Sequence, residues 1–253
     1  MFFKFGLIGE HLKHSYSKEL HTKIMKDMGI SGSYGIIEIP STNFHDAFSN
    51  ILTQDYNGLN VTIPYKEAVI PYLDVISKSA KKIGAVNTIS FKDNTSFGYN
   101  TDYDGFLQVF KNHSIDIKGK KAAILGYGGA SKAVIAALND NGAESILVVT
   151  RNIPDSTDRL PFHITNYGDF NIRRDSYDFI INCTPVGMYP NMKNSPIPKA
   201  SIRSEYLFDL IYNPTETLLI SHAIELGIKT FNGMEMLESQ ARKSQEIWAI
   251  DSK

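Results

Sequence analysis

Short apolar runs alternate with apolar residues at helical spacing along most of the chain. The clearest case is the run Lys121–Leu125, which stops at Gly126 and is followed by apolar residues at 133, 134, 137 and 138. A second apolar run follows at 146–150. Runs of this length are typical of buried strands, and the spacing between them is typical of a helix. The stretch therefore predicts a strand, a tight turn, a helix and a second strand, which together form a βαβ unit.

The same alternation continues on both sides of this unit. Toward the N-terminus it predicts strands at 3–8, 34–39 and 59–63, a hairpin through Asp93 and Asn94, and helices beginning near 17, 40, 64, 77 and 102. Toward the C-terminus it predicts strands at 162–164, 177–182, 206–212 and 228–231, and helices over 213–226 and 233–248. This pattern indicates two α/β domains, a front domain over the first hundred residues and a second domain, with a parallel sheet, around the βαβ unit.

Composition narrows the classes of function. The chain has 253 residues, 42% of them hydrophobic, and a net charge of −1, so it offers no global basic field for nucleic acid or an anionic membrane. Its single cysteine, Cys183, excludes an intramolecular disulfide and fits a reducing compartment. The apolar N-terminus is too short for a signal peptide, and no run is long enough to span a membrane. We expect a cytoplasmic protein without a metal site, because the seven histidines lack ligand spacing.

The turn of the βαβ unit carries the first candidate site. Gly126 permits a sharp turn, and Gly128 and Gly129 allow a phosphate to approach bare backbone at a helix N-terminus. The third glycine of the dinucleotide motif is missing, with Ser131 and Ala133 in that region. The residue after the second strand is Arg151, which suits a 2′-phosphate, whereas an acidic residue there would suit NAD. This stretch alone is equally consistent with an ordinary turn and a chance surface arginine.

Four polar residues of the front domain have both a structural and a functional interpretation. Ser17 can cap the helix that follows it, whereas Ser15 has no such role, and the pair can instead bind a carboxylate. Lys66 is predicted in the first turn of a helix after Pro64, where a cation opposes the helix dipole, although it can also point into water. Asp102 can be a plain N-cap, as can Thr101 before it.

Seven segments, taken together, resemble the shikimate dehydrogenase family. They are His14 to Ser17, Asn60 to Lys66, Gly84 to Thr88, Asn100 to Gly105, Gly126 to Ala130, Asn182 to Met188 and Gly233 to Gln240. They occur in the order of the family and cover nearly the whole chain. The resemblance implies a substrate-binding domain of residues 1–103 plus 234–253 and a Rossmann-like NADP-binding domain of residues 104–233. It also implies reversible reduction of 3-dehydroshikimate to shikimate with NADPH, in the pathway to chorismate and the aromatic amino acids.

The resemblance also assigns roles to residues. It implies that Lys66 and Asp102 are the catalytic pair, because hydride transfer must be matched by a proton moving at the same alcohol oxygen. A lysine with a pKa near 10.4 is a poor base at neutral pH, so we expect burial and the helix N-terminus to lower its pKa and Asp102 mainly to orient it. The implied substrate-binding residues are Ser15, Ser17, Thr62, Lys66, Asn87, Asp102, Tyr212 and Gln240. The implied cofactor-binding residues are Gly126, Tyr127, Gly128, Gly129, Ala130, Thr150, Arg151, Leu210 and Gly233.

The sequence departs from the family pattern in several places. Lys18 replaces a usual proline, Tyr127 replaces a small residue beside the pyrophosphate, and the usual second basic residue after Arg151 is missing, with Ile153, Pro154 and Asp155 in its place. The chain also ends soon after Trp248, where members usually carry another helix. Two alternatives stay open, a quinate/shikimate dehydrogenase that uses NAD and a redox-nucleotide sensor without turnover. We expect a monomer or a homodimer.

Overall fold

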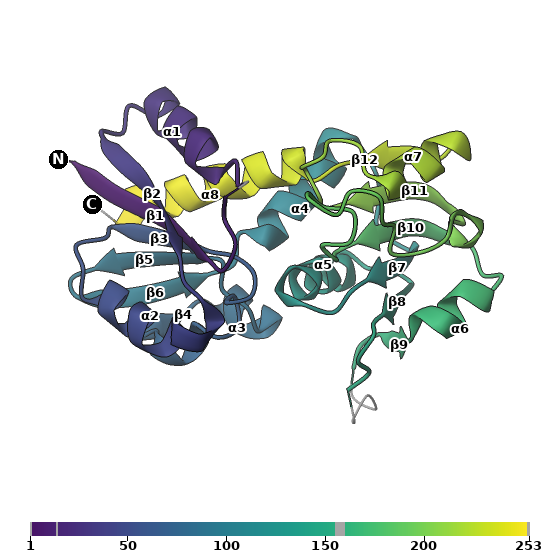
Figure 1. Ribbon diagram of the computed structural model, residues 1–253, viewed down its shortest axis with the longest axis horizontal. Helices are drawn as coiled ribbons and strands as arrows, with labels where there is room; N and C mark the ends of the chain where they lie inside the picture. The colour runs from purple at the N-terminus through teal and green to yellow at the C-terminus, as the bar shows by residue number, and fades with distance from the viewer. Residues whose placement is uncertain (1, 14, 155–159, 252–253) are drawn as a thin grey trace. The chain divides into compact units, whose positions relative to one another are not determined.

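The chain forms two compact units, each built around its own sheet (Figure 1). The computed structural model describes residues 2–13, 15–154 and 160–251. The first unit comprises Met1–Gly105 and Glu238–Lys253, and the second comprises Phe106–Leu237. The sequence interpretation placed these boundaries at 103/104 and 233/234. Two α/β units, one of them with a parallel sheet, confirm the predicted fold class.

The first unit contains a mixed six-stranded sheet in the order β2-β1-β3-β5-β6-β4. Its strands are β1 (Phe3–Gly9), β2 (Gly32–Glu38), β3 (Gly58–Val61), β4 (Val75–Ile76), β5 (Thr88–Lys92) and β6 (Thr95–Tyr99), and its helices are α1 (Ser17–Asp27), α2 (Phe44–Leu52) and α3 (Lys78–Ile83). Short 3-10 helices lie at Ser41–Asn43 and Ile70–Tyr72. Strand β3 runs parallel to β1 and antiparallel to β5, which in turn runs antiparallel to β6. The end of β1, the end of β3, the start of β5 and the end of β6 therefore share one edge of the sheet.

The second unit contains six strands, paired parallel throughout, in the order β12-β11-β10-β7-β8-β9. The strands are β7 (Lys121–Leu125), β8 (Ser145–Val149), β9 (His163–Thr165), β10 (Tyr177–Asn182), β11 (Ser204–Asp209) and β12 (Lys229–Phe231). The helices are α5 (Gly129–Asp140), α6 (Tyr167–Ile172), α7 (Leu218–Glu225) and a 3-10 helix at Lys199–Ser201, while α4 (Asp102–Asn112) and α8 (Met234–Asp251) cross the unit boundaries. This strand order is that of the Rossmann fold, in which the order of successive strands reverses between β7 and β10.

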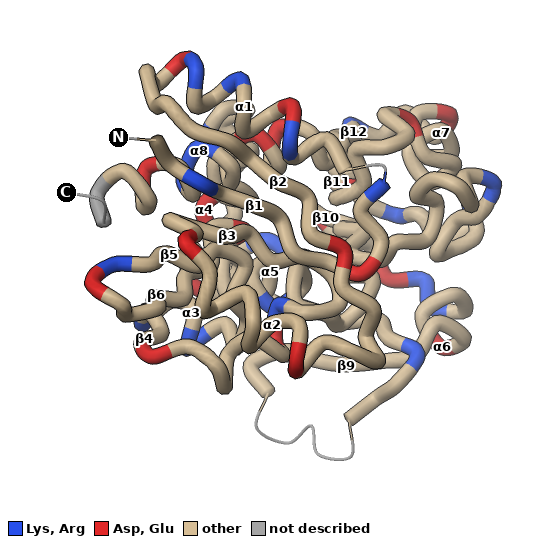
Figure 2. The backbone as a smooth tube through the Cα atoms, turned by 60° about the vertical axis from the view of Figure 1, so that its left-hand side comes forward, with Lys and Arg blue, Asp and Glu red and all other residues tan. Residues whose placement is uncertain are grey.

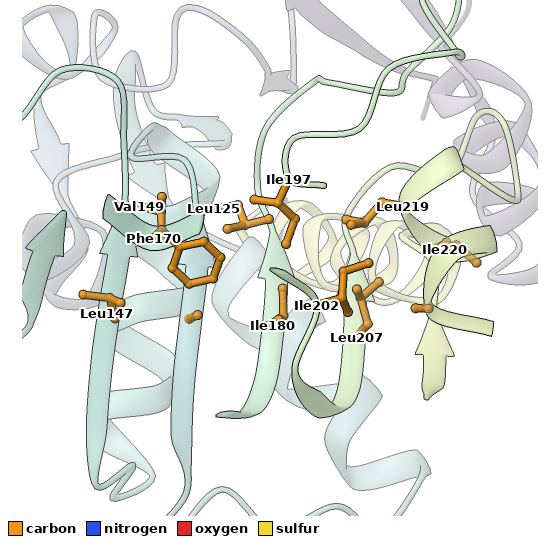
Figure 3. Close-up of a cluster of buried hydrophobic side chains, with 12 residues drawn as sticks. Leu125, Leu147, Val149, Phe170, Ile180, Ile197, Ile202, Leu207, Leu219 and Ile220 are labelled. Atoms are coloured by element: carbon orange, nitrogen blue, oxygen red, sulfur yellow. The ribbon is translucent and has the colours of Figure 1, made fainter. Parts of the chain in front are cut away.

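Apolar side chains from the strands and covering elements form the core of the second unit (Figure 3). Leu125, Ile180 and Leu207 come from three neighbouring strands, and Phe170 from α6 and Leu219 from α7 pack over them. Such continuous apolar strands are expected where both faces of a parallel sheet are covered. Both signs of charge are distributed along the chain in both units (Figure 2).

Three secondary-structure predictions were wrong, and the two-residue strand β4 was not predicted. The helix expected from Asn213 begins at Leu218, because Thr217 is its N-cap and its hydroxyl accepts a hydrogen bond from the amide of Ile220. Helix α6 was missed, although Asn166 caps it by accepting from Asp169 N. The helix expected from Pro64 is a series of turns, in which Val69 N donates to Tyr65 O but Ile70 N donates to Glu67 O. The change of spacing breaks the ladder that an α-helix requires.

Candidate active site

A lysine and a carboxylate meet at the shared edge of the first unit's sheet. Lys66 Nζ donates to Asp102 Oδ2 at 2.5 Å, and the two side chains are 11% and 8% exposed. Lys66 follows β3 in the turn segment, and its carbonyl accepts a hydrogen bond of 2.7 Å from Val86 N just before β5. Because this segment is not a helix, the predicted helix dipole is absent at Lys66. Burial and the Asp102 carboxylate therefore set its electrostatic surroundings.

Asp102 is the first residue of α4, but it does not act as the N-cap. The side chain of Asn100, two residues before the helix, satisfies its first amides instead, since its Oδ1 accepts from the amides of Asp102 at 3.1 Å and Tyr103 at 3.4 Å. The carboxylate of Asp102 is therefore available to Lys66 and to Asn87, whose Nδ2 donates to Asp102 Oδ1 at 3.0 Å. A negative charge in the first turn of a helix is also stabilised by the helix dipole. The functional interpretation of Asp102 is thus favoured over the simple cap.

Asn87 joins this pair to the C-terminal helix. Its Nδ2 lies 3.4 Å from Gln240 Oε1, and its Oδ1 accepts from Thr101 N at 2.7 Å. Gln240 and Ser244 both lie on α8, and Ser244 Oγ donates to Gln240 O at 3.0 Å. The structure thus brings together Lys66, Asn87, Asp102 and Gln240, four of the residues that the sequence assigned to substrate or catalysis.

The network that supports these residues was missed from the sequence. Asn60 Nδ2 donates to Asn87 O at 3.2 Å and to Ser244 Oγ at 3.0 Å, while Tyr34 OH donates to Asn60 Oδ1 at 2.8 Å. Thr88 Oγ1 lies 2.8 Å from Ser244 Oγ. Asn60 is only 5% exposed, in a strand that is otherwise apolar. A polar residue in a fully buried strand was the available signal, because such groups require hydrogen-bond partners.

The serine pair lies in the loop after β1 and at the start of α1. Ser17 is the first helical residue, and the N-cap position belongs to Tyr16, which makes no side-chain cap hydrogen bond. Ser15 Oγ instead accepts from Ser17 N at 3.3 Å and donates to Ser17 Oγ at 3.1 Å. The prediction that Ser17 rather than Ser15 can serve the helix end was therefore wrong. His14, the first residue of this segment, lies outside the described residues.

Thr62 adjoins the same loop. A Cβ on Gly9, the last residue of β1, would lie 2.7 Å from Thr62 Cγ2, so the ends of β1 and β3 touch there. Thr62 N also donates to Ile8 O at 2.9 Å. The remaining predicted substrate residue, Tyr212, belongs to the second unit, where it is partly buried shortly after β11.

The glycine turn of the second unit exposes bare backbone at a helix N-terminus. Gly126 has φ of 98°, which favours glycine, and α5 begins at Gly129 after Gly128 without a side-chain cap or an acidic residue in its first turn. A Cβ on Gly128 would meet no described atom within 4 Å. Uncapped N–H groups and the positive end of the helix dipole suit an anion such as a pyrophosphate. The small residues Ser131 and Ala133 are each 0% exposed, as close helix packing requires.

The other predicted cofactor residues surround the ends of neighbouring strands. Thr150 and Arg151 directly follow β8, and Thr150 N donates to Thr165 O at 2.9 Å. The Arg151 side chain is exposed, and among the described residues no ion pair involves it. Leu210 and Gly233 adjoin each other, since a Cβ on Gly233 would lie 2.0 Å from Leu210 O. Asp155, which the sequence placed near Arg151, lies outside the described residues.

Tyr127, the bulky residue of the turn, packs against an aromatic neighbour. Its ring centroid lies 5.6 Å from that of Phe162, and Lys132 Nζ lies 5.9 Å from the Tyr127 centroid. Ala130 is the second residue of α5 and is partly buried. The described residues include no group of three or more His, Cys, Asp or Glu that could hold a metal ion. Of the helices in the described ranges, none is both long and apolar enough to cross a membrane.

Comparison with known proteins places this geometry in a family. Residues 7–89 match the family model of the shikimate dehydrogenase substrate binding domain. A shikimate dehydrogenase (NADP(+)) of Clostridium beijerinckii is 43% identical over 249 residues, covering 96% of this chain and 91% of the relative. The crystal structure of shikimate dehydrogenase 1 from Peptoclostridium difficile superposes with a TM-score of 0.93 at 43% identity, covering 98% of this chain and 92% of the other.

A third similar structure was solved with ligands. It is the shikimate 5-dehydrogenase from Thermus thermophilus in complex with NADP(H) and shikimate, with a TM-score of 0.85 at 30% identity. The match covers 97% of this chain and 93% of the other.

Proposed function

The chain belongs to the shikimate dehydrogenase family, and we propose that it catalyses the reversible NADPH-dependent reduction of 3-dehydroshikimate to shikimate. The observation that carries the proposal is the buried Lys66–Asp102 pair at one edge of the first sheet, held by Asn87, which is in turn linked to Gln240. Relatives of this similarity are named as NADP-dependent shikimate dehydrogenases. The reaction places the enzyme in the pathway to chorismate and the aromatic amino acids.

Lys66 moves the proton at the reacting oxygen in this mechanism. Reduction of a ketone converts its carbonyl oxygen to a hydroxyl, so a positioned acid must supply a proton there, and the reverse reaction needs a base at the same atom. NADPH, when bound, supplies the hydride. Asp102 fixes the ammonium through one carboxylate oxygen, while Asn87 binds the other oxygen at 3.0 Å. The carboxylate is thereby held in one orientation, and we assign Lys66, Asn87 and Gln240 to contact the substrate hydroxyls.

The substrate carboxylate is assigned to the serine pair. Ser15 and Ser17 present two hydroxyls near the N-terminus of α1, a helix of 11 residues whose positive end favours an anion. Thr62, at the touching ends of β1 and β3, and Tyr212 complete the proposed set of substrate contacts. The carboxylate is remote from the reacting alcohol, so these hydroxyls mainly contribute binding.

The cofactor site is assigned to the carboxyl edge of the parallel sheet. The uncapped N-terminus of α5 and the open space beside Gly128 fit a pyrophosphate. Arg151 is placed to bind the 2′-phosphate, with Thr150 beside it, and Leu210 and Gly233 line the site on the other side of the sheet's switch point.

One steady-state assay tests the proposal. Turnover is measured for shikimate and for quinate, each with NADP and with NAD, by the absorbance of the reduced nicotinamide. We expect the pair of shikimate and NADP to give the highest kcat/KM. A preference for quinate with NAD would establish the neighbouring activity instead, and cofactor binding without turnover in any combination would establish a sensor.

Two further properties belong to the same proposal. We propose that the enzyme works in the cytoplasm, since its single cysteine fits a reducing compartment. We also propose a monomer or a homodimer, which light scattering of the purified chain distinguishes.

A further inference from the structure

The last residue of strand β11 in the second unit carries a buried carboxylate. Asp209 is 1% exposed and accepts three hydrogen bonds. Its Oδ1 accepts from Asn182 Nδ2 at 2.9 Å and from Ile211 N at 3.1 Å, and its Oδ2 accepts from Thr217 Oγ1 at 2.6 Å. A single side chain thus ties together the end of β10, the turn after β11 and the N-cap of α7.

The network continues from Asn182 into the loop after β10. Asn182 is 0% exposed, and its Oδ1 accepts from Thr184 N at 3.0 Å and from Thr184 Oγ1 at 2.7 Å. Thr184 Oγ1 in turn accepts from Val186 N at 3.2 Å. Because Asn182 uses its amide nitrogen on Asp209 and its amide oxygen on Thr184, Asp209 decides which way the Asn182 amide faces.

Thr184 also limits the glycine turn after β7. A Cβ added to Gly126 would lie 2.8 Å from Thr184 Cγ2, so the methyl group occupies the space beside the Gly126 α-carbon. The backbone on each side is pinned, as Gly126 N donates to Val149 O at 2.8 Å and Cys183 N donates to Leu125 O at 2.9 Å. The two loops that meet here flank the switch point of the sheet, between β7 and β10.

Burying an ionisable side chain in such a network costs free energy of folding, because the charged form loses its hydration. Burial raises the pKa of Asp209 to about 6, despite the hydrogen bonds from Thr217, Ile211 and Asn182, which lower it. A carboxylate accepts with both oxygens and donates from neither, and that matches the three donors around Asp209. Alanine at this position would leave three buried donors without their acceptor.

We propose that Asp209 is a positioning residue for the cofactor site: through Asn182 it holds Thr184 against Gly126, and so fixes the two loops between which NADPH binds. The identity of the ligand rests on the proposed function. Asp209 itself does not touch the cofactor in this proposal. Its effect is carried by the chain of hydrogen bonds from Asp209 to the Thr184 hydroxyl and by the methyl contact with Gly126.

The test compares four substitutions in the full chain. In Asp209→Ala the donors lose their acceptor, whereas in Asp209→Asn the Oδ1 acceptor remains and an amide hydrogen can reach the Thr217 hydroxyl. Thr184→Val keeps the methyl on Gly126 and removes the hydroxyl. Ser201→Ala removes another buried hydroxyl of the same unit, one that bonds to Asn171 O at 3.4 Å instead of to this network.

Dissociation constants for NADPH and for shikimate are measured separately, by the fluorescence of the reduced nicotinamide and by calorimetry. We expect Asp209→Ala and Thr184→Val to weaken NADPH binding about tenfold, and Asp209→Asn to restore it to within about threefold of the parent. The shikimate constant stays unchanged in all four variants. Ser201→Ala lowers the melting temperature without changing NADPH binding.

Two outcomes would overturn the proposal. In the first, Thr184→Val binds NADPH as the parent does; this arm decides the matter even if Asp209→Ala does not fold. In the second, Asp209→Ala and Ser201→Ala weaken NADPH binding in proportion to their loss of stability, which would make the network purely structural.

Hydrogen exchange separates this inference from the proposed function. In the ligand-free chain, Asp209→Asn should leave the amides of Thr184 and Val186 protected, and Asp209→Ala should speed their exchange. If the parent binds no NADPH, the proposed function fails while this readout still tests the positioning. Equal exchange in parent and Asp209→Ala would refute the positioning role whatever the ligand.

Discussion

The two units prepare their sites in opposite ways. In the first unit, the candidate site consists of polar side chains. Hydrogen bonds link Lys66, Asn87, Asp102 and Gln240, and further hydrogen bonds from Asn60 and Ser244 support them. In the second unit, the candidate site is bare backbone at a glycine turn, open beside Gly128. The side chains of the Asp209 network bind the loops of this unit to each other.

The difference follows from what each ligand requires. A ring with several hydroxyls is distinguished from similar molecules by donors and acceptors at fixed places, and these must be side chains of defined geometry. A pyrophosphate needs only N–H groups and positive potential, and a helix N-terminus supplies both. Substitutions in the first unit should therefore affect substrate and turnover, and those in the second should affect cofactor.

The largest effect expected is that of Lys66→Ala. It removes the proton donor at the reacting oxygen, so we expect kcat to fall by about 100- to 10,000-fold while shikimate binding changes little. Single-turnover absorbance and calorimetry measure the two quantities. Lys92→Ala, which alters an exposed lysine at the end of β5, is the matched control. A near-normal kcat in Lys66→Ala would show that another group moves the proton.

Each unit also buries a titratable group whose pKa is strongly shifted by burial, and the two should respond to pH in opposite directions. Burial lowers the pKa of His21, in the first unit, from 6.5 to about 3. The unfolded chain therefore binds a proton between these values that the folded chain does not, and stability falls as the pH drops through them. Burial raises the pKa of Asp209 from 3.8 to about 6, so between those values the folded chain binds the extra proton and stability rises as the pH drops.

Urea unfolding at pH 7 and pH 5 measures both contributions. His21→Phe keeps a ring against Tyr34, whose ring centroid lies 4.2 Å from that of His21. In the parent, the free energy of unfolding should fall by an amount on the order of 2 kcal/mol from pH 7 to pH 5, and this variant should not show that loss. Asp209→Asn should remove a gain in the free energy of unfolding on the order of 1 kcal/mol from pH 7 to pH 5. Trp248, the single tryptophan, is 1% exposed in the first unit, so its fluorescence follows the His21 contribution. Circular dichroism, which reports on the helices of both units, follows the Asp209 contribution. Equal pH dependence in the parent and in both variants would contradict the assignment.

The fold was largely predictable from the sequence, because apolar residues are consecutive in the buried strands and recur at helical spacing in the helices. Prediction failed where local signals conflict with tertiary contacts. Pro64 predicts the start of a helix. The carbonyl of Lys66 instead accepts a hydrogen bond from Val86 N, which is distant in sequence. Helix α6 has 6 residues, too few to show a period.

The site was predictable only in part. The resemblance gave Lys66, Asn87, Asp102 and Gln240, and the structure joins these four into one hydrogen-bonded cluster. The supporting residues Asn60 and Ser244 were not predicted, because their hydrogen bond spans 184 positions and no local pattern encodes it. No supporting role was predicted for Asn182 and Asp209 either, because their hydrogen bond joins residues 27 positions apart.

Cofactor preference is the third measurement, with an expected effect of about tenfold or more. Arg151 can make charge-assisted bonds to a 2′-phosphate, each contributing roughly 1.5–3 kcal/mol, and NAD offers it no anion. Arg151→Ala should lower kcat/KM for NADP strongly and for NAD little, and higher salt should act in the same direction. Without the second basic residue of the family, we expect a narrower preference than a two-cation clamp gives. Arg174→Ala, an exposed arginine of the same unit, is the control.

Two results of that experiment would contradict the assignment of Arg151 to the 2′-phosphate. A parent enzyme that favours NAD, or an Arg151→Ala variant in which both kcat/KM values fall together, would show that Arg151 does not bind the 2′-phosphate.

The smallest effect expected is that of the serine pair. Ser15→Ala combined with Ser17→Ala removes two hydroxyls assigned to a carboxylate remote from the reacting alcohol, and such contacts stabilise ground and transition states alike. We therefore expect KM for shikimate to rise several-fold to about tenfold while kcat changes little. Ser15 Oγ also accepts from Ser17 N, so the double variant should lose some stability as well. Thr22→Ala provides the matched control, because it removes a hydrogen bond of 2.7 Å to Lys18 O on the same helix and lies outside the proposed site. If Thr22→Ala and the double variant lower the melting temperature equally, only the double variant should raise KM. A double variant that loses stability but keeps the parent's KM would leave these serines a role in the helix end alone.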